Sequence, residues 1–120
     1  MTHVRFQGTT PTSRGTFPGV FALVNGLSAR LTPAQETFRR TTNAWYHAHL
    51  ADPSAADPTV YDRTLHPTAA AWFRASAHEC LDRVPGYLAI LTAHHVPYET
   101  VWSDSPGRVI YADVHQIVVT

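Results

Sequence analysis

Histidine is the residue type with the most chemical potential in this chain, because eight occur among 120 residues. A histidine titrates near neutral pH and can act as a general base, a proton donor or a metal ligand. A zinc site needs three or four converging ligands, and two histidines on a helix share a face when they are four residues apart. No histidine pair has that spacing, and neither C-x-x-C nor H-E-x-x-H occurs. We therefore predict no metal site.

The sequence also lacks the patterns of nucleophilic catalysis and of phosphate-binding loops. It contains no G-x-S-x-G elbow, no Walker loop and no dinucleotide-binding glycine pattern. The single cysteine, Cys80, falls on the apolar face of a predicted helix, where cysteine usually acts as a small hydrophobe. Because one cysteine cannot form an internal disulfide, we expect a reduced, cytoplasmic protein. We predict no cofactor.

The remaining candidates for a site are histidines and aromatic residues around one predicted helix. His49 and Tyr46 lie at the edge of its apolar face, so they could be partly desolvated and still reach a cleft. We predict them as catalytic residues, with His49 as the base, and predict ligand binding by Asn43, His47, His66 and Trp72. The competing interpretation is that Trp45 and Trp72 are core residues and that Tyr46 and His49 are amphipathic edge residues. The sequence favours this second interpretation, since such residues are common on ordinary helices.

The helix that would position these residues is predicted at 33–50 and is the clearest element of the sequence. Thr32 suits the N-cap, Pro33 suits the first helical position, and Gln35 completes a capping box. At 100° per residue, the apolar face consists of Ala34, Phe38, Thr41, Trp45 and Ala48. We expect Phe38 and Trp45 to be core residues.

Further helices are predicted at 67–83 and 86–95 from their apolar periodicity. Residues 18–24 fit either a short helix or a buried strand, with flanking Pro and Asn-Gly favouring the helix. We also expect the cap residue Asp57, followed by Pro58, to open a short helical turn.

Strand signals occur at both ends of the chain. Residues 3–7 alternate between polar and apolar, as in a half-buried strand. Near the C-terminus, β-branched and aromatic stretches flank a dense turn signal at 103–107, and a third strand follows if the chain turns at Asp113. The sequence thus predicts one α+β domain, 1–120, in which three main helices pack on a small antiparallel sheet built from a C-terminal hairpin, with an N-terminal strand as an option.

Composition limits the classes of partner. Only 15% of residues are charged and the formal net charge is zero. We therefore expect no nucleic-acid partner, since such proteins usually carry an excess of basic residues. We also expect no membrane association, because no stretch of about 20 apolar residues occurs. Nine arginines without lysine indicate a GC-rich bacterial genome.

Aromatic and arginine side chains on a surface with few charges suit protein interfaces. Our leading hypothesis is therefore a protein-binding accessory or regulatory domain, and the alternative is a small enzyme using histidine acid–base catalysis in a helix–sheet cleft. A homodimer through the last strand is a third expectation, because Ile117, Val118 and Val119 would otherwise form an exposed apolar strand edge that can pair with another chain.

Overall fold

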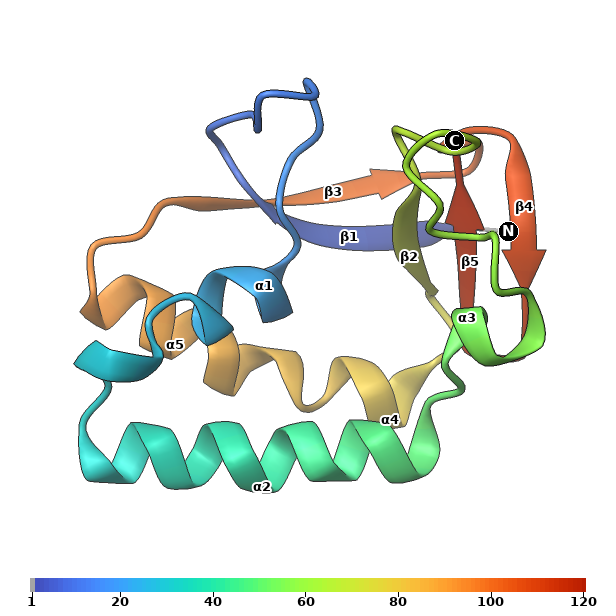
Figure 1. Ribbon diagram of the computed structural model, residues 1–120. Coiled ribbons are helices and arrows are strands. Elements are labelled where there is room, and N and C mark those ends of the chain that lie inside the picture. The colour runs from blue at the N-terminus through green and yellow to red at the C-terminus, as the bar shows by residue number, and fades with distance from the viewer. Residues whose placement is uncertain (1) are drawn as a thin grey trace.

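The computed structural model describes residues 2–120 and shows an α+β fold with helices on one side of a sheet (Figure 1). The helices are α1 (Val20–Asn25), α2 (Pro33–His49), α3 (Pro53–Ala56), α4 (His78–Leu81) and α5 (Val84–Ala93), with a 3-10 turn at Ser28–Arg30. The strands are β1 (His3–Gly8), β2 (Ala70–Arg74), β3 (Tyr98–Ser103), β4 (Val109–Ala112) and β5 (Gln116–Val119). They form one antiparallel sheet in the order β3-β1-β2-β5-β4.

This sheet consists of two halves that meet over a short junction. β1 pairs with β3 at all six of its residues, and β2, β5 and β4 pair in the other half. Between the halves, β1 and β2 pair only at His3 with Arg74 and at Val4 with Phe73. Beyond Val4 the two strands separate, and the far end of β1 pairs with Gly19 in the returning chain. In Figure 1, β1 and β3 accordingly run at a steep angle to β2 and β5.

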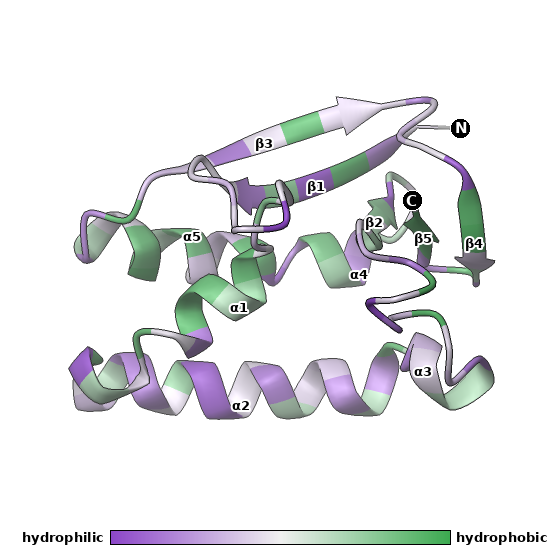
Figure 2. Ribbon diagram, turned by 45° about the horizontal axis from the view of Figure 1, so that its top comes forward, coloured by the Kyte–Doolittle hydropathy of each residue, from purple (hydrophilic) through white to green (hydrophobic). Residues whose placement is uncertain are grey.

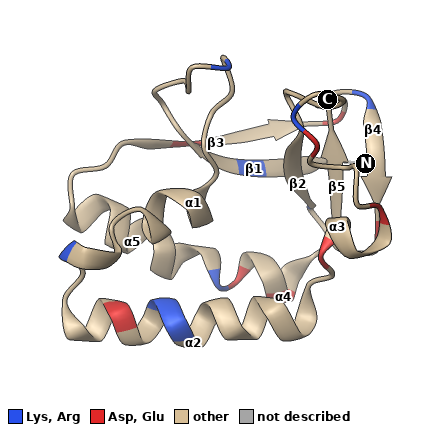
Figure 3. Cartoon of the chain, in the orientation of Figure 1, with Lys and Arg blue, Asp and Glu red and all other residues tan. Residues whose placement is uncertain are grey.

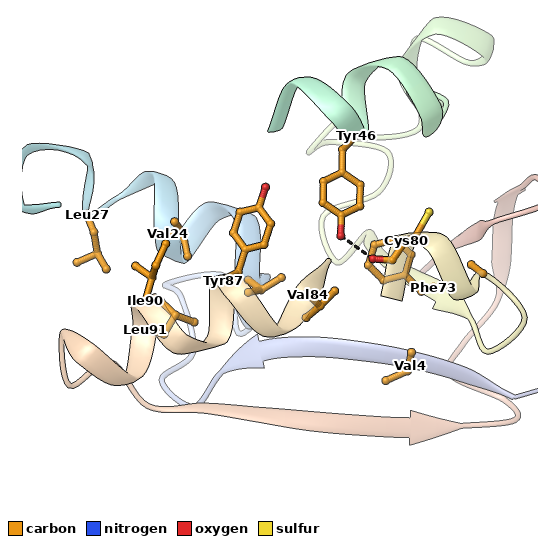
Figure 4. Packing of buried hydrophobic residues seen from close by; sticks show 12 residues of the cluster. Val4, Val24, Leu27, Tyr46, Phe73, Cys80, Val84, Tyr87, Ile90 and Leu91 are labelled. Atoms are coloured by element: carbon orange, nitrogen blue, oxygen red, sulfur yellow. Dashed lines mark hydrogen bonds between the residues drawn. The ribbon is translucent and has the colours of Figure 1, made fainter. Parts of the chain in front are cut away.

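The main core lies between the sheet and the helices. Val4, Val24, Tyr87 and Leu91 are fully buried there (Figure 4). Along α1 and α5 most residues are hydrophobic, whereas α2 carries many hydrophilic ones (Figure 2). α1 and α5 therefore supply most of the apolar surface that covers the sheet.

A second, smaller cluster lies on the other face of the sheet. It contains Trp72, Ile117 and Val119, with Val101 packed against it. Because successive side chains of a strand point to opposite faces, Trp72 belongs to this cluster while Phe73 belongs to the main core.

Several predictions of elements are confirmed. The fold is α+β, with an N-terminal strand and a C-terminal hairpin. The 33–50 and 86–95 helices correspond to α2 and α5, and the apolar run predicted at 18–24 as a helix or a strand is the short helix α1 from Val20 onward. The capping box is present, since the backbone N–H of Gln35 donates to Thr32 Oγ1 at 3.2 Å and that of Thr32 to Gln35 Oε1 at 3.0 Å.

The predicted 67–83 helix is wrong. Residues 70–74 form strand β2, and only the four-residue helix α4 lies within the remainder. Both faces of β2 are covered, so its sequence shows no polar–apolar alternation, and its alanines suggest a helix. At Asp57 the chain does turn, as a hydrogen-bonded turn over residues 58–61 in which Asp57 Oδ1 accepts from the N–H of Thr59, although no helix forms there. The short helix α3 lies just before it and was not predicted; it starts where the Asp52 side chain accepts a hydrogen bond from the N–H of Ser54.

The predicted hairpin turn at 103–107 is wrong as well. That segment connects β3 to β4, which lie at opposite edges of the sheet, and the hairpin is formed by β4 and β5 around Asp113. β5 is paired on both sides and offers no free edge. A homodimer therefore stays a prediction, but its route through the C-terminal strand is closed.

The buried face of α2 is rotated from the predicted one. Thr42 and Tyr46 are its buried residues, whereas Phe38 and Trp45 are half-buried and pack against the rim of the main core. Ala34, which the prediction placed on the buried face, is exposed. An alanine side chain buries little apolar area, so its position says little about which face of a helix is covered.

Candidate functional site

A pocket of about 220 Å³ opens where β1 and β2 separate. We call it the junction pocket. Its walls come from β1, α1, β2 and the chain after α2, and they are mainly apolar, including Phe6, Phe21, Leu50, Pro53, Tyr61 and Trp72. Aromatic walls around a hollow of this kind are typical of small-molecule sites.

Arg5 is the single charged residue among those that line the junction pocket. Its guanidinium extends across the gap between the strands: Nη1 donates to the carbonyl of Ala71 at 2.7 Å and Nη2 to that of Phe17 at 2.8 Å. Nε donates to Oε1 of Gln7 at 3.0 Å. These three acceptors are uncharged, so the hydrogen bonds fix the position of the guanidinium without neutralising it.

The positive charge of Arg5 has no ion-pair partner among the described residues. β1 carries an arginine and no acidic residue (Figure 3). Burial lowers the pKa of Arg5 and also raises the pKa of the Tyr61 hydroxyl, with the Arg5 charge opposing the latter shift. An arginine that is partly desolvated without a counterion favours the approach of an anion.

Gly19 leaves one side of this guanidinium open. A Cβ at Gly19 would lie 3.5 Å from Nη2 and 3.7 Å from Nη1 of Arg5, an ordinary contact distance. The backbone of Gly19 has φ −74°, which any residue can adopt. The absence of a side chain at this wall therefore leaves space beside the charge rather than relieving backbone strain.

A second pocket, of about 260 Å³, contains three of the predicted site residues: Asn43, Tyr46 and His47. Two of them are engaged in internal hydrogen bonds. The buried Tyr46 hydroxyl donates to the carbonyl of Cys80 at 2.6 Å (Figure 4), and the Tyr87 hydroxyl donates to Asn43 Oδ1 at 2.5 Å. Burial raises the pKa of Tyr46, so its phenol stays protonated.

The other predicted residues lie apart from this second pocket. His49 is exposed and lines none of the three pockets of this section. Its ring stacks on that of Trp45, with 4.3 Å between the centroids, and its Nδ1 lies 2.8 Å from the Trp45 carbonyl oxygen. Arg83 packs over the same indole, 3.5 Å from its centroid. Trp72 is in the junction pocket. His66 lines a third pocket, of about 270 Å³, which we call the arginine pocket because Arg14 and Arg63 line it.

Arg5 was not found by sequence reasoning. The alternation of residues 3–7 places it on the polar side of a strand, where an arginine is usually solvated. Its role depends on the separation of β1 from β2, which is a long-range feature with no local signal.

Neither a metal-ligand cluster nor a membrane-crossing helix is found in residues 2–120. No three His, Cys, Asp or Glu side chains of this part of the chain lie together as metal ligands could. Every helix described is too short or too polar to traverse a lipid bilayer. In comparisons with known proteins, no family model, no curated protein and no solved structure matches the chain.

Proposed function

We propose that this protein binds a small apolar carboxylate in the junction pocket. The observation that carries the proposal is the Arg5 guanidinium, which is fixed by three hydrogen bonds to neutral acceptors and has no ion-pair partner among the described residues. A planar guanidinium matches a carboxylate in geometry and charge. The aromatic walls would take the apolar part of the same molecule.

The volume of the pocket limits the size of the ligand. Ligand pockets for drug-sized molecules measure about 300–1,000 Å³, whereas the junction pocket measures about 220 Å³. An engineered cavity of about 150 Å³ is known to hold benzene. A single aromatic ring with one carboxyl group, such as benzoate, is therefore the size of ligand that we propose.

The test is a calorimetric titration with benzoate and with benzamide, which has the same shape and no charge. We expect saturable binding of benzoate and at least about tenfold weaker binding of benzamide, because a hydrogen bond to a charged group contributes about 1.5–3 kcal/mol. Arg5→Gln should weaken benzoate binding by a similar factor. Arg30→Gln, at an exposed site on the 3-10 turn, removes the same charge and should leave binding unchanged.

Gly19→Ala provides a second variant that leaves the Arg5 charge in place. The added methyl group would contact the guanidinium and should weaken benzoate binding while the fold is retained. Equal affinity for benzoate and benzamide, or undiminished binding by Arg5→Gln, would refute the carboxylate site.

A protein-binding role, the leading hypothesis from the sequence, is the second candidate. Trp102 is 58% exposed on β3, an edge strand whose outer side is unpaired in the sheet, and exposed aromatics and free edges are common in interfaces. A second copy of the chain is the simplest partner. Sedimentation velocity should then show a dimer that Trp102→Ala dissociates and that Val114→Ala, at another exposed apolar residue, does not. A wild-type monomer at all concentrations would exclude this pairing.

The enzymatic alternative has less support from the geometry. Its proposed base, His49, is exposed and lines none of the three pockets described above. A general base must lie within hydrogen-bond reach of a bound substrate.

A further inference from the structure

The arginine pocket differs from the junction pocket in the chemistry of its lining. It measures about 270 Å³ and lies between the loop that follows β1 and the chain that leads into β2. Arg14 and Thr16 line it from the first segment, and Tyr61, Arg63 and His66 from the second. No acidic residue is part of its lining.

The two arginines of this pocket carry charges that the described residues do not neutralise. Neither Arg14 nor Arg63 forms a side-chain hydrogen bond or an ion pair within residues 2–120. Two guanidinium groups on one hollow repel each other unless an anion lies between them. Although the formal net charge of the chain is zero, this pocket therefore has a local excess of positive charge.

The acidic residues nearest in sequence are held by their own turns. Asp57 Oδ1 accepts hydrogen bonds from the backbone N–H and the hydroxyl of Thr59, at 3.0 and 2.8 Å. Asp62 Oδ1 accepts from the backbone N–H groups of Thr64 and Leu65. These bonds lower the pKa of Asp57, where the charge of His66 also contributes. Both carboxylates therefore shape the loop and do not line the pocket.

We propose that the arginine pocket binds the phosphate group of a small molecule. A phosphate dianion accepts several hydrogen bonds at once, and arginine pairs with it in a bidentate geometry. The imidazole of His66 and the hydroxyl of Tyr61 add two further groups that can donate. This site does not depend on the junction pocket for its chemistry, since the two share only Tyr61.

The test is a titration with inorganic phosphate and with pyrophosphate at constant ionic strength, followed by amide chemical shifts and by calorimetry. We expect saturable binding, tighter for pyrophosphate, with the largest shifts at Thr16, Arg63 and Ala69. In the double variant Arg14→Gln/Arg63→Gln the affinity for pyrophosphate should fall at least tenfold, because two charge-assisted interactions are lost. Both side chains are exposed, so the fold should persist.

The matched control is Arg30→Gln/Arg108→Gln, which removes the same charge at two exposed positions outside the pocket. It should bind pyrophosphate like the wild type. The proposal is overturned if the wild type shows no saturable binding, if the shifts lie elsewhere, or if the control weakens as much as the double variant, which would indicate attraction by net charge alone. Benzoate binding in the junction pocket is measured separately, so either site can fail without the other.

Discussion

His3 is a buried histidine whose two ring nitrogens lack a hydrogen-bond partner among the described residues. It lies on β1, paired in register with Arg74 on one side and Ser103 on the other. Burial lowers its pKa and the charge of Arg74 acts in the same direction, while the backbone of Ser103 and the charge of Asp104 oppose this shift but do not cancel it. The folded protein therefore holds His3 neutral under conditions where an unfolded chain would begin to protonate it.

This difference makes stability depend on pH. Below about pH 6.5, the ordinary pKa of histidine, the unfolded chain binds a proton that the folded protein takes up only at a lower pH. His3 thus lowers the free energy of unfolding as the pH falls from about 6.5 towards its folded-state pKa, with a slope of up to about 1.4 kcal/mol per pH unit. His3→Gln should reduce the slope between pH 7 and 5 in urea unfolding, while His78→Gln, at an exposed site, should not. An identical slope in His3→Gln would contradict this assignment.

Tyr46 illustrates what sequence reasoning could and could not say about a candidate site residue. Its place at the edge of the apolar face was deduced from helix periodicity. Its hydrogen bond to the carbonyl of Cys80, 34 residues away, depends on how α2 packs against α4. With that bond and a raised pKa, the hydroxyl acts as a structural donor. Helix periodicity identifies a residue near the edge of a buried face, but it does not identify the group on another element that this residue contacts.

α2 and α5 approach closely where Phe38 faces Gly86. A Cβ at Gly86 would overlap the Phe38 ring, and this ring also packs edge-on against Tyr87, with centroids 5.2 Å apart. Glycine normally costs about 0.5–1 kcal/mol relative to alanine within a helix. Here a Cβ would force the Phe38 ring out of its position, so we expect the packing of the two helices to favour glycine.

Gly86→Ala should therefore destabilise the protein, by about 1–3 kcal/mol as in other overpacked cores. The measurement is the free energy of unfolding in urea, arranged as a double-mutant cycle with Phe38→Ala. In the Phe38→Ala background the overlap is gone, and Gly86→Ala should become neutral or stabilising by up to about 1 kcal/mol. If Gly86→Ala has the same effect in both backgrounds, the close approach is not what selects glycine.

Elements with local signals were predictable, and those defined by distant partners were not. α2 has a complete capping box in its own sequence. β2 is a strand because β1 and β5 flank it, although its own residues suggest a helix. The segment 103–107 does connect two strands, β3 and β4, as its turn residues indicate. These two strands do not pair with each other, because the other strands of the sheet lie between them.

The junction between the two halves of the sheet is the least paired part of the sheet, with only two residue pairs between β1 and β2. Arg5 and the junction pocket lie at this place. Walls from both halves line the pocket, Phe6 from one and Trp72 from the other. A ligand there would contact both halves and oppose their separation.

If benzoate binds as proposed, hydrogen exchange should slow in both halves together. At 100 times the dissociation constant, binding stabilises the folded state by about 2.7 kcal/mol, which corresponds to an approximately hundredfold slower exchange of amides that open with the junction. We expect this in β1 and β2 alike, while the amide of Val114, whose residue is 75% exposed in the hairpin turn, should exchange as fast as before. In Arg5→Gln, where the affinity should be about tenfold lower, benzoate at the same concentration should slow exchange by only about tenfold. Slower exchange in one half alone would mean that the ligand contacts that half and does not connect the two across the gap that β1 and β2 leave open.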